Sequence, residues 1–215
     1  MKDSLLPFAP EGYPFVLVPA VAGLLAWLFG YPAIAIAAWA VAVFCVSFFR
    51  NPPRHSDAPE HAILAPADGK VIAVTGAPPA LAAAGLPHQV SIFMSPLNVH
   101  VNRAPISGRV AEARWSPGAK LPAFRDKASD LNEHAFVRLE GKLGNVAYKQ
   151  IAGSLARRVV CDLTTGDEVE RGQRVGLIKF SSRVDLFLPA EARIVVGVNQ
   201  RCRAGVTVVA HFPRP

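Results

Sequence analysis

The stretch Gly-Leu-Ile-Lys-Phe-Ser-Ser-Arg-Val-Asp-Leu-Phe-Leu-Pro occupies residues 176–189 and contains two adjacent serines, Ser181 and Ser182. One apolar run, Val175–Phe180, leads into the serine pair, and a second, Asp185–Leu188, follows it. Short apolar runs bounded by Gly and Pro are typical of buried β-strands. The serines are therefore predicted to lie where one strand ends and the next begins. Taken alone, such a pair is most often an ordinary polar turn.

The same pattern of short apolar runs separated by Gly, Pro and Asn covers the chain after residue 61. It predicts a mainly β domain built from antiparallel sheet. The further predicted strands are Lys70–Val74, Gln89–Met94, Arg109–Arg114, Ala135–Leu139, Val146–Ala152, Ala192–Val198 and Val206–Phe212. Two segments have the composition of short helices, Ala80–Ala84 and Ser154–Val160.

A weak internal repeat refines this fold class. Residues 66–71 (PADGKV) resemble 105–110 (PISGRV), and residues 169–176 (VERGQRVG) resemble 202–208 (CRAGVTV). In each copy a glycine at a turn precedes a β-branched residue that enters a strand. Units of this kind are typical of barrel-sandwich folds, including biotinyl and lipoyl carriers, so we expect a barrel-sandwich-like β domain.

The N-terminal part of the chain is strongly apolar. Residues 12–49 contain no charged side chain, and Gly30-Tyr31-Pro32 divides this stretch into two halves. Each half has roughly 16–17 residues, the short limit for a helix that crosses a bilayer. We favour a hairpin of two membrane helices with both ends on one side. A single kinked span and a buried helical pair of a soluble protein are the alternatives.

Arg50 and Arg54 directly follow the second apolar half, which by the positive-inside tendency places the rest of the chain in the cytoplasm. We therefore expect an anchoring segment and linker, residues 1–55, and a catalytic domain, residues 56–215. Residues 50–215 carry 22 Lys and Arg against 14 Asp and Glu. This basic balance suits anionic lipid headgroups. No helix-turn-helix, zinc or RNP pattern supports a nucleic-acid partner.

The cysteines do not indicate a disulfide framework or a metal site. Cys45, Cys161 and Cys202 are too few, and no pair has the C-x-x-C spacing. Their sparse, odd number is compatible with a reducing compartment.

Three motifs, in order along the chain, resemble the short bacterial phosphatidylserine decarboxylases. Residues 65–69 (APADG) look like the P-A-D-G element of that family, and residues 95–105 (SPLNVHVNRAP) look like its N-x-H-x-N-R-x-P element. Residues 180–189 (FSSRVDLFLP) look like its F-G-S-R-V-D-x-x-L-P element. The resemblance extends over essentially the whole chain, including the apolar N-terminal part.

The resemblance implies a self-cleaving proenzyme. The Ser182 hydroxyl would attack the carbonyl of Ser181, and β-elimination would leave a β chain of residues 1–181. The α chain, residues 182–215, would begin with a pyruvoyl group made from Ser182. That covalent cofactor would form a Schiff base with the amine of phosphatidylserine, and loss of CO2 would give phosphatidylethanolamine. No metal or diffusible cofactor is implied.

Asp68 and His100 match the residues that would assist catalysis, and His134 is a weaker candidate. A histidine pKa lies in the range useful for proton transfer. Two positions depart from the family. Arg103 stands where the longer members have a second histidine, although the short members have Arg there too. Ser181 replaces the usual Gly, although Gly allows the strained backbone that an acyl shift requires.

Two other functions compete with the enzyme. The first is a membrane-tethered barrel-sandwich scaffold that is not processed because of Ser181. The second is a biotinyl- or lipoyl-like carrier modified on Lys179, which lacks the flanking methionines of biotin carriers. For the enzyme we expect a cell-membrane location, a phospholipid substrate and association of the two cleaved chains. The oligomeric state stays open, a homo-oligomer included.

Overall fold

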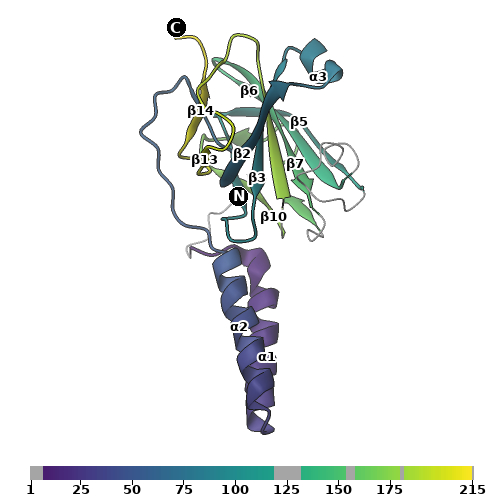
Figure 1. Cartoon of the computed structure of the whole chain (residues 1–215). Coiled ribbons are helices and arrows are strands. Elements are labelled where there is room, and N and C mark those ends of the chain that lie inside the picture. Colours follow the sequence, from purple (N-terminus) through teal and green to yellow (C-terminus); the bar gives the residue numbers. More distant parts are fainter. Residues whose placement is uncertain (1–6, 119–131, 154–157, 180–181, 215) are drawn as a thin grey trace. The chain divides into compact units, whose positions relative to one another are not determined.

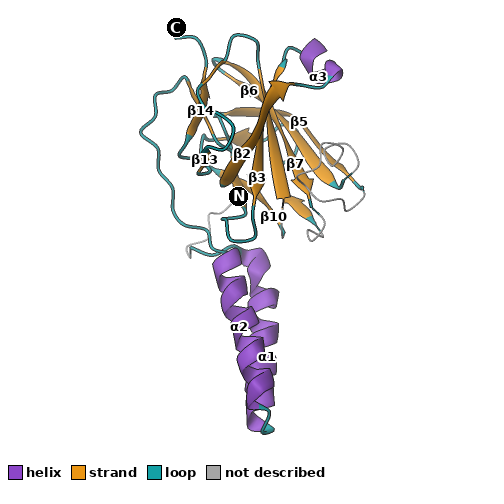
Figure 2. Cartoon of the chain, in the orientation of Figure 1, coloured by secondary structure: helices purple, strands orange, loops and turns teal. Residues whose placement is uncertain are grey.

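The computed structural model describes residues 7–118, 132–153, 158–179 and 182–214 (Figure 1). The chain forms two compact units, Met1–Pro53 and Arg54–Pro215. The first unit is helical and the second is mostly β-sheet (Figure 2). The predicted fold class, a mainly β domain preceded by an apolar helical hairpin, is confirmed.

The helical unit contains the short 3-10 helix Pro10–Gly12, α1 (Tyr13–Leu28) and α2 (Pro32–Phe48). The chain reverses at Gly30, whose φ of +80° favours glycine. The two far ends meet, because the Ala9 amide donates to the Phe49 carbonyl at 2.8 Å. Between them the Trp39 indole donates to a carbonyl of α1 at 3.3 Å. The two helices therefore form a hairpin rather than one kinked helix.

The exterior of this hairpin is apolar. Many large side chains on both helices are exposed, among them Leu28 at 69% and Val43 at 69%. In the described chain, one helical stretch of 19 residues, Pro10–Leu28, is long and apolar enough to cross a membrane. The apolar helix Pro32–Phe48 is shorter. This exterior suggests membrane association, since water disfavours so much exposed apolar surface.

The β unit contains three antiparallel sheets and one short helix, α3 (Pro79–Ala83). The largest sheet has the strand order β13-β2-β3-β11-β7-β6-β5-β9, and the smaller ones have the orders β4-β10-β8 and β1-β14-β12. The strands are β1 (Ala62–Leu64), β2 (Gly69–Gly76), β3 (His88–Met94), β4 (Val101–Arg103), β5 (Gly108–Ser116), β6 (His134–Gly141), β7 (Gly144–Ala152), β8 (Val159–Cys161), β9 (Glu168–Val169), β10 (Arg174–Ile178), β11 (Ser182–Leu188), β12 (Arg193–Ile194), β13 (Arg201–Cys202) and β14 (Val208–His211).

The interior of the β unit follows from residue alternation. On β11, Val184, Leu186 and Leu188 belong to the main apolar core. Phe187 points to the other side of the sheet, into a smaller cluster near α3. Because successive side chains of a strand point to opposite faces, β11 contributes to both clusters. This strand is central, since it pairs with β3 on one side and with β7 on the other.

Most predicted strands are present, and two predictions are wrong in part. A helix was predicted over Ser154–Val160, but Val159 and Val160 belong to strand β8, where they pair with β10. Residues 154–157 of that prediction lie outside the described part of the chain. Two adjacent β-branched side chains fit a pleated sheet better than a helix. The strand predicted over Ala192–Val198 is limited to Arg193–Ile194.

The first pair of repeats in the sequence corresponds to equivalent turns in the structure. Gly69 opens β2, and a Cβ there would collide with the carbonyl oxygen of Phe93. Gly108 opens β5, and a Cβ there would collide in the same way with the carbonyl oxygen of Glu140. Glycine is needed at both positions because a neighbouring strand passes too closely for any side chain.

The second pair of repeats completes this correspondence. Gly172 and Gly205 both have positive φ values, +82° and +68°. The Gly172 amide donates to the Ala104 carbonyl, and the Gly205 amide donates to the Ala65 carbonyl, both at 2.9 Å. Each C-terminal glycine turn is thus tied to the residue before one of the two Pro-containing turns. The Arg103 amide donates to the Pro66 carbonyl at 3.0 Å, so the PADG turn lies beside β4, which begins directly after His100.

Candidate active site

Ser182 lies at the start of β11, between the ends of two neighbouring strands. It pairs with Met94 of β3 and with Ala152 of β7. Its side chain is fully buried, and its Oγ donates to the Met94 Sδ at 3.2 Å. A thioether is a weak acceptor, so this contact leaves the hydroxyl available for chemistry. Ser181, the other half of the predicted cleavage site, lies outside the described residues.

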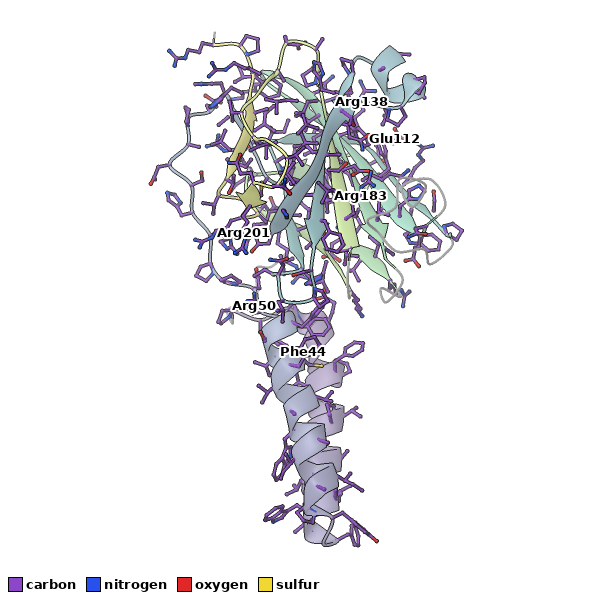
Figure 3. All side chains as sticks on the ribbon, in the orientation of Figure 1. Phe44, Arg50, Glu112, Arg138, Arg183 and Arg201 are labelled. Carbon is purple, nitrogen blue, oxygen red and sulfur yellow. The ribbon has the colours of Figure 1, made fainter. Side chains whose placement is uncertain are left out.

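Two charged residues that follow Ser182 on β11 form a buried ion pair. Arg183 and Asp185 point to the opposite face of the sheet from Ser182. Their side chains form a bidentate ion pair, with Nε–Oδ1 and Nη2–Oδ2 distances of 2.6 and 2.9 Å. Asp185 is fully buried and Arg183 nearly so. Figure 3 shows Arg183 among the strands of the β unit. Because both residues belong to β11, each compensates the buried charge of the other within the strand.

Two buried amides approach the Ser182 hydroxyl from the strands around it. Gln150 of β7 donates through Nε2 to the Oδ1 of Asn102 at 2.8 Å. This bond orients the Asn102 amide so that its Nδ2 faces the Pro66 carbonyl at 3.4 Å and the Met94 Sδ at 3.8 Å. The Asn102 donor and the Ser182 hydroxyl therefore both contact the Met94 sulfur. Asn102 and Gln150 are both fully buried, which makes them unusual polar groups in this apolar interior.

His100 lies two residues before Asn102 and is also fully buried. Its Nδ1 is 2.9 Å from the Asn98 carbonyl oxygen. A carbonyl only accepts, so Nδ1 carries the proton and Nε2 is the nitrogen able to take one up. The loop before His100 is held by the Asn98 Oδ1, which accepts from the amide and the hydroxyl of Ser95 at 2.9 and 2.8 Å. The imidazole is thus fixed in one orientation.

Asp68 follows the Pro66 turn and is 8% exposed. Its Oδ2 accepts from the Arg54 guanidinium at 2.9 Å, and its Oδ1 accepts from the Ala204 amide at 2.7 Å. Burial and the Asp68 charge raise the pKa of the nearby Cys202 thiol to about 11. The carboxylate therefore ties the turn to the linker and to the loop before β14, and Cys202 stays protonated at neutral pH.

The three predicted catalytic residues lie around one end of the main sheet. The Pro66 carbonyl accepts from the Arg103 amide at 3.0 Å, which joins the turn of Asp68 to β4, the strand that follows His100. The His100 carbonyl accepts from the Ile178 amide at 3.3 Å. Ser182 and Asn102 meet at Met94. Asp68 itself directs its two described hydrogen bonds away from Ser182, toward Arg54 and Ala204.

His134, the weaker candidate, begins β6 at the same end of the sheet. Its Nδ1 lies 2.8 Å from the Asn132 carbonyl oxygen, and its ring is half-buried. Lys179 follows β10 at this end too, and its amide donates to the Arg158 carbonyl at 3.2 Å. Among the described residues, no group of three His, Cys, Asp or Glu side chains has the geometry of a metal site.

The sequence motifs did not predict that Met94, Gln150 and Arg54 lie next to the candidate site residues and their partners. The sequence did contain a signal for Gln150. This residue lies on the same face of β7 as Tyr148 and Ala152, which point into the core. A glutamine in a core-facing position requires a partner, here Asn102. Met94 had no comparable signal, since methionine is an ordinary core residue.

The chain was compared with known proteins. The family model described as phosphatidylserine decarboxylase matches residues 41–210. A protein of Magnetococcus marinus is 45% identical over 204 residues, which cover 93% of this chain and 92% of its own. Proteins of Syntrophotalea carbinolica and Burkholderia mallei are 43% and 41% identical, each over at least 95% of both chains. All three relatives are named phosphatidylserine decarboxylase proenzyme.

Proposed function

The chain belongs to the phosphatidylserine decarboxylase family, and we propose that it converts phosphatidylserine into phosphatidylethanolamine and CO2 through a pyruvoyl group made from Ser182. One observation carries the proposal beyond the family name. Ser182 is a fully buried serine at the first position of a central strand, and its hydroxyl is held only by a thioether at 3.2 Å among the described contacts.

The first reaction is self-cleavage. The Ser182 oxygen attacks the carbonyl carbon of Ser181, the peptide C–N bond breaks, and the nitrogen takes the hydroxyl proton, which gives an ester. Loss of the Ser182 α-proton then breaks the Cβ–Oγ bond, releasing the Ser181 carboxylate and leaving dehydroalanine. Water converts the dehydroalanine into a pyruvoyl group and ammonia. Each step requires a base near Ser182 and a donor for the developing oxyanion.

The residues around Ser182 suit these requirements. His100 presents a buried imidazole whose Nδ1 is fixed on a carbonyl, so Nε2 is the nitrogen that accepts or returns a proton. Asn102 supplies an amide donor that Gln150 orients toward the Met94 side of Ser182. Asp68 assists by holding the Pro66 turn, whose carbonyl contacts Asn102. We assign His100 the proton transfers and Asn102 the stabilisation of negative charge.

The pyruvoyl group fits the position because it is small, flat and derived from the Ser182 atoms themselves. The wall beside it is the apolar side chain of Met94, whose sulfur also contacts the amide of Asn102. When formed, the group supplies a ketone that takes up the amine of the lipid headgroup and withdraws the electrons left as CO2 departs. The buried surroundings exclude water, and His100 can return a proton to the product carbon.

The fold also suits a stable product of self-cleavage. The strand that follows the cleaved bond pairs with β3 along its whole length and with β7 from Ser182 to Phe187, so the α chain, residues 182–215, stays bound to the β chain, residues 1–181. The apolar hairpin would anchor both chains in the cell membrane. Arg50 at the end of the hairpin favours a cytoplasmic location for the catalytic unit.

Mass spectrometry of the purified full chain tests this proposal. Wild type should yield fragments 1–181 and 182–215, the latter with an N-terminal carbonyl that reacts with phenylhydrazine, and should release CO2 from phosphatidylserine. Ser182→Ala should stay uncut and inactive. Ser91→Ala is the matched control, because Ser91 is an equally buried serine on the neighbouring strand. An uncut wild-type chain would instead favour the unprocessed scaffold, and added mass on Lys179 would favour the carrier.

A further inference from the structure

The strand ends around Ser182 form one continuous rim of the β unit. We define the site rim by Leu97, Trp115, Arg158, Lys179 and Ser182. Pairings across the sheet connect the ends of β3, β11, β7, β6 and β5 in this order. In these pairings Ser182 faces Met94 and Ala152, and Ser116 faces His134.

Large apolar side chains are exposed on this rim. Among the described residues of Arg54–Pro215, four large apolar side chains are more than a third exposed. They are Leu97 at 75%, Trp115 at 58%, Val198 at 53% and Val195 at 42%. The two most exposed, Leu97 and Trp115, both lie on the site rim. Leu97 follows β3 and Trp115 lies on β5. Four strand spacings, roughly 19 Å, separate these two strands, and β11 with Ser182 lies between them.

The indole of Trp115 has a fixed orientation. Its Nε1 donates to the Glu133 Oε1 at 3.3 Å, and the same oxygen accepts from the Val159 amide at 2.9 Å. The polar edge of the ring is therefore satisfied by the protein, while its apolar body is exposed. Tryptophan with this division between a bonded N–H and an exposed ring is typical of membrane–water interfaces.

Positive charge accompanies the two apolar side chains. Arg158 is exposed and Lys179 is half-buried, and a hydrogen bond joins their backbones. Glu133 is already engaged by Trp115 and Val159. Basic side chains beside isolated apolar ones match an anionic bilayer surface, where cations bind headgroups and apolar groups enter the boundary with the acyl chains.

We propose that the site rim docks on the surface of an anionic bilayer, with Leu97 and Trp115 inserted and with Arg158 and Lys179 on the headgroups. The inference rests on the proposed function, since it explains how a buried Ser182 meets a substrate whose acyl chains stay in the membrane. Docking brings the lipid headgroup to the strand ends without extracting the lipid. The two anchors on opposite sides of Ser182 also set the tilt of the β unit on the surface.

Activity on two forms of the substrate tests the docking. The double variant Leu97→Asp/Trp115→Asp, in the full chain, should lose about tenfold or more of kcat/KM on phosphatidylserine in phosphatidylcholine–phosphatidylglycerol vesicles. On dissolved dihexanoyl phosphatidylserine it should stay within about twofold of wild type, since no bilayer takes part. Val195→Asp is the control. Val195 has an exposed apolar side chain, follows β12 directly and bonds through its amide to Val209 of β14. Equal rates for the double variant and the control on vesicles would overturn the docking surface.

A label at residue 97 tests the same surface without using activity. In the full chain with Cys45, Cys161 and Cys202 replaced by Ala, a thiol-reactive nitrobenzoxadiazole should label Leu97→Cys alone. Its emission should shift to the blue in the mixed vesicles, and less in pure phosphatidylcholine or high salt. The label at Val195→Cys should not shift. An inactive wild type with a shifted Leu97→Cys label would refute the proposed function and keep the docking, whereas an unshifted label would refute the docking alone.

Discussion

At the scale of single residues, the site depends on polar groups placed where the core is otherwise apolar. Asn102 and Gln150 bond to each other at 2.8 Å in full burial. When a buried amide loses its partner, its unsatisfied C=O or N–H group still costs the free energy of removing it from water. Such a pair is therefore a weak way to stabilise a fold and a good way to hold one donor in a fixed orientation.

Gln150→Leu should separate these two roles. The change leaves the Asn102 Oδ1 without its donor, so we expect a loss of about 1–3 kcal/mol in the free energy of unfolding. We also expect at least about tenfold slower self-cleavage, because the Asn102 amide loses its orientation. Urea unfolding and the rate at which fragment 182–215 appears measure the two effects.

The matched control is Gln89→Leu. Gln89 is a nearly buried glutamine on β3 that donates to the Ser91 hydroxyl at 2.9 Å. It should lose similar stability and cleave at the wild-type rate. If both variants slow cleavage equally, the effect comes from general loosening of the sheet, and Asn102 has no special role.

Asp68 poses a second question at this scale, because its carboxylate is bound by Arg54 at 2.9 Å. Arg54→Gln and Asp68→Asn both break this ion pair, and each should reduce stability by about 1–3 kcal/mol. Asp68→Asn also removes the carboxylate itself. We therefore expect it to slow self-cleavage about tenfold more than Arg54→Gln. Equal cleavage rates in a time course of the purified proenzymes would make Asp68 a structural residue only.

Sequence motifs predicted Ser182, His100 and Asp68 as site residues but did not predict the residues that surround them. Met94 is 88 positions from Ser182, and Gln150 is 48 positions from Asn102. Strand pairing brings them together, and the register of a sheet is fixed by the packing of whole strands. A local motif therefore predicts which residues carry chemistry, whereas their partners follow only from the topology.

At the scale of elements, long strands were predictable and short ones were not. β7 matches its apolar pattern nearly to the residue, because one of its faces is in the core. The strands β9, β12 and β13 have two residues each, too few to produce a periodic pattern. They close the edges of sheets, and their conformation is imposed by the strands with which they pair.

Gly176 shows how an element position can matter to the site. It lies within β10 with φ at +156°, and a Cβ there would collide with the Val160 carbonyl and lie 3.2 Å from the Gln150 Nε2. Gly176→Ala should therefore reduce stability by about 1–3 kcal/mol and slow self-cleavage through Gln150. Gly197→Ala is the control, since its Cβ would meet nothing within 4 Å. It should be neutral or stabilise by up to about 1 kcal/mol. Thermal unfolding that ranks the two variants equally would contradict this account.

At the scale of the whole molecule, the apolar hairpin suits a lipid environment, whereas the β unit suits water. The hairpin exposes large apolar side chains, while the β unit buries its own in one main core. The helices α1 and α2 have 16 and 17 residues, so each is roughly 24–26 Å long. This is slightly less than the hydrocarbon thickness of about 30 Å. The hairpin can therefore cross the membrane only where the bilayer thins or where its ends and its turn lie at the interfaces.

Cysteine labelling from each side of the membrane tests the crossing. In a bacterial cell that expresses the full chain with Cys45, Cys161 and Cys202 replaced by Ala, we expect a membrane-impermeant maleimide to label Tyr31→Cys from outside. Asp57→Cys, in the exposed linker, should react only in inverted membranes, because the positive-inside tendency at Arg50 favours the cytoplasm for that end of the hairpin. The Trp27 and Tyr31 rings near the turn favour the outer interface. If both cysteines react only in inverted membranes, the hairpin enters one leaflet and returns, and the anchor is interfacial rather than spanning.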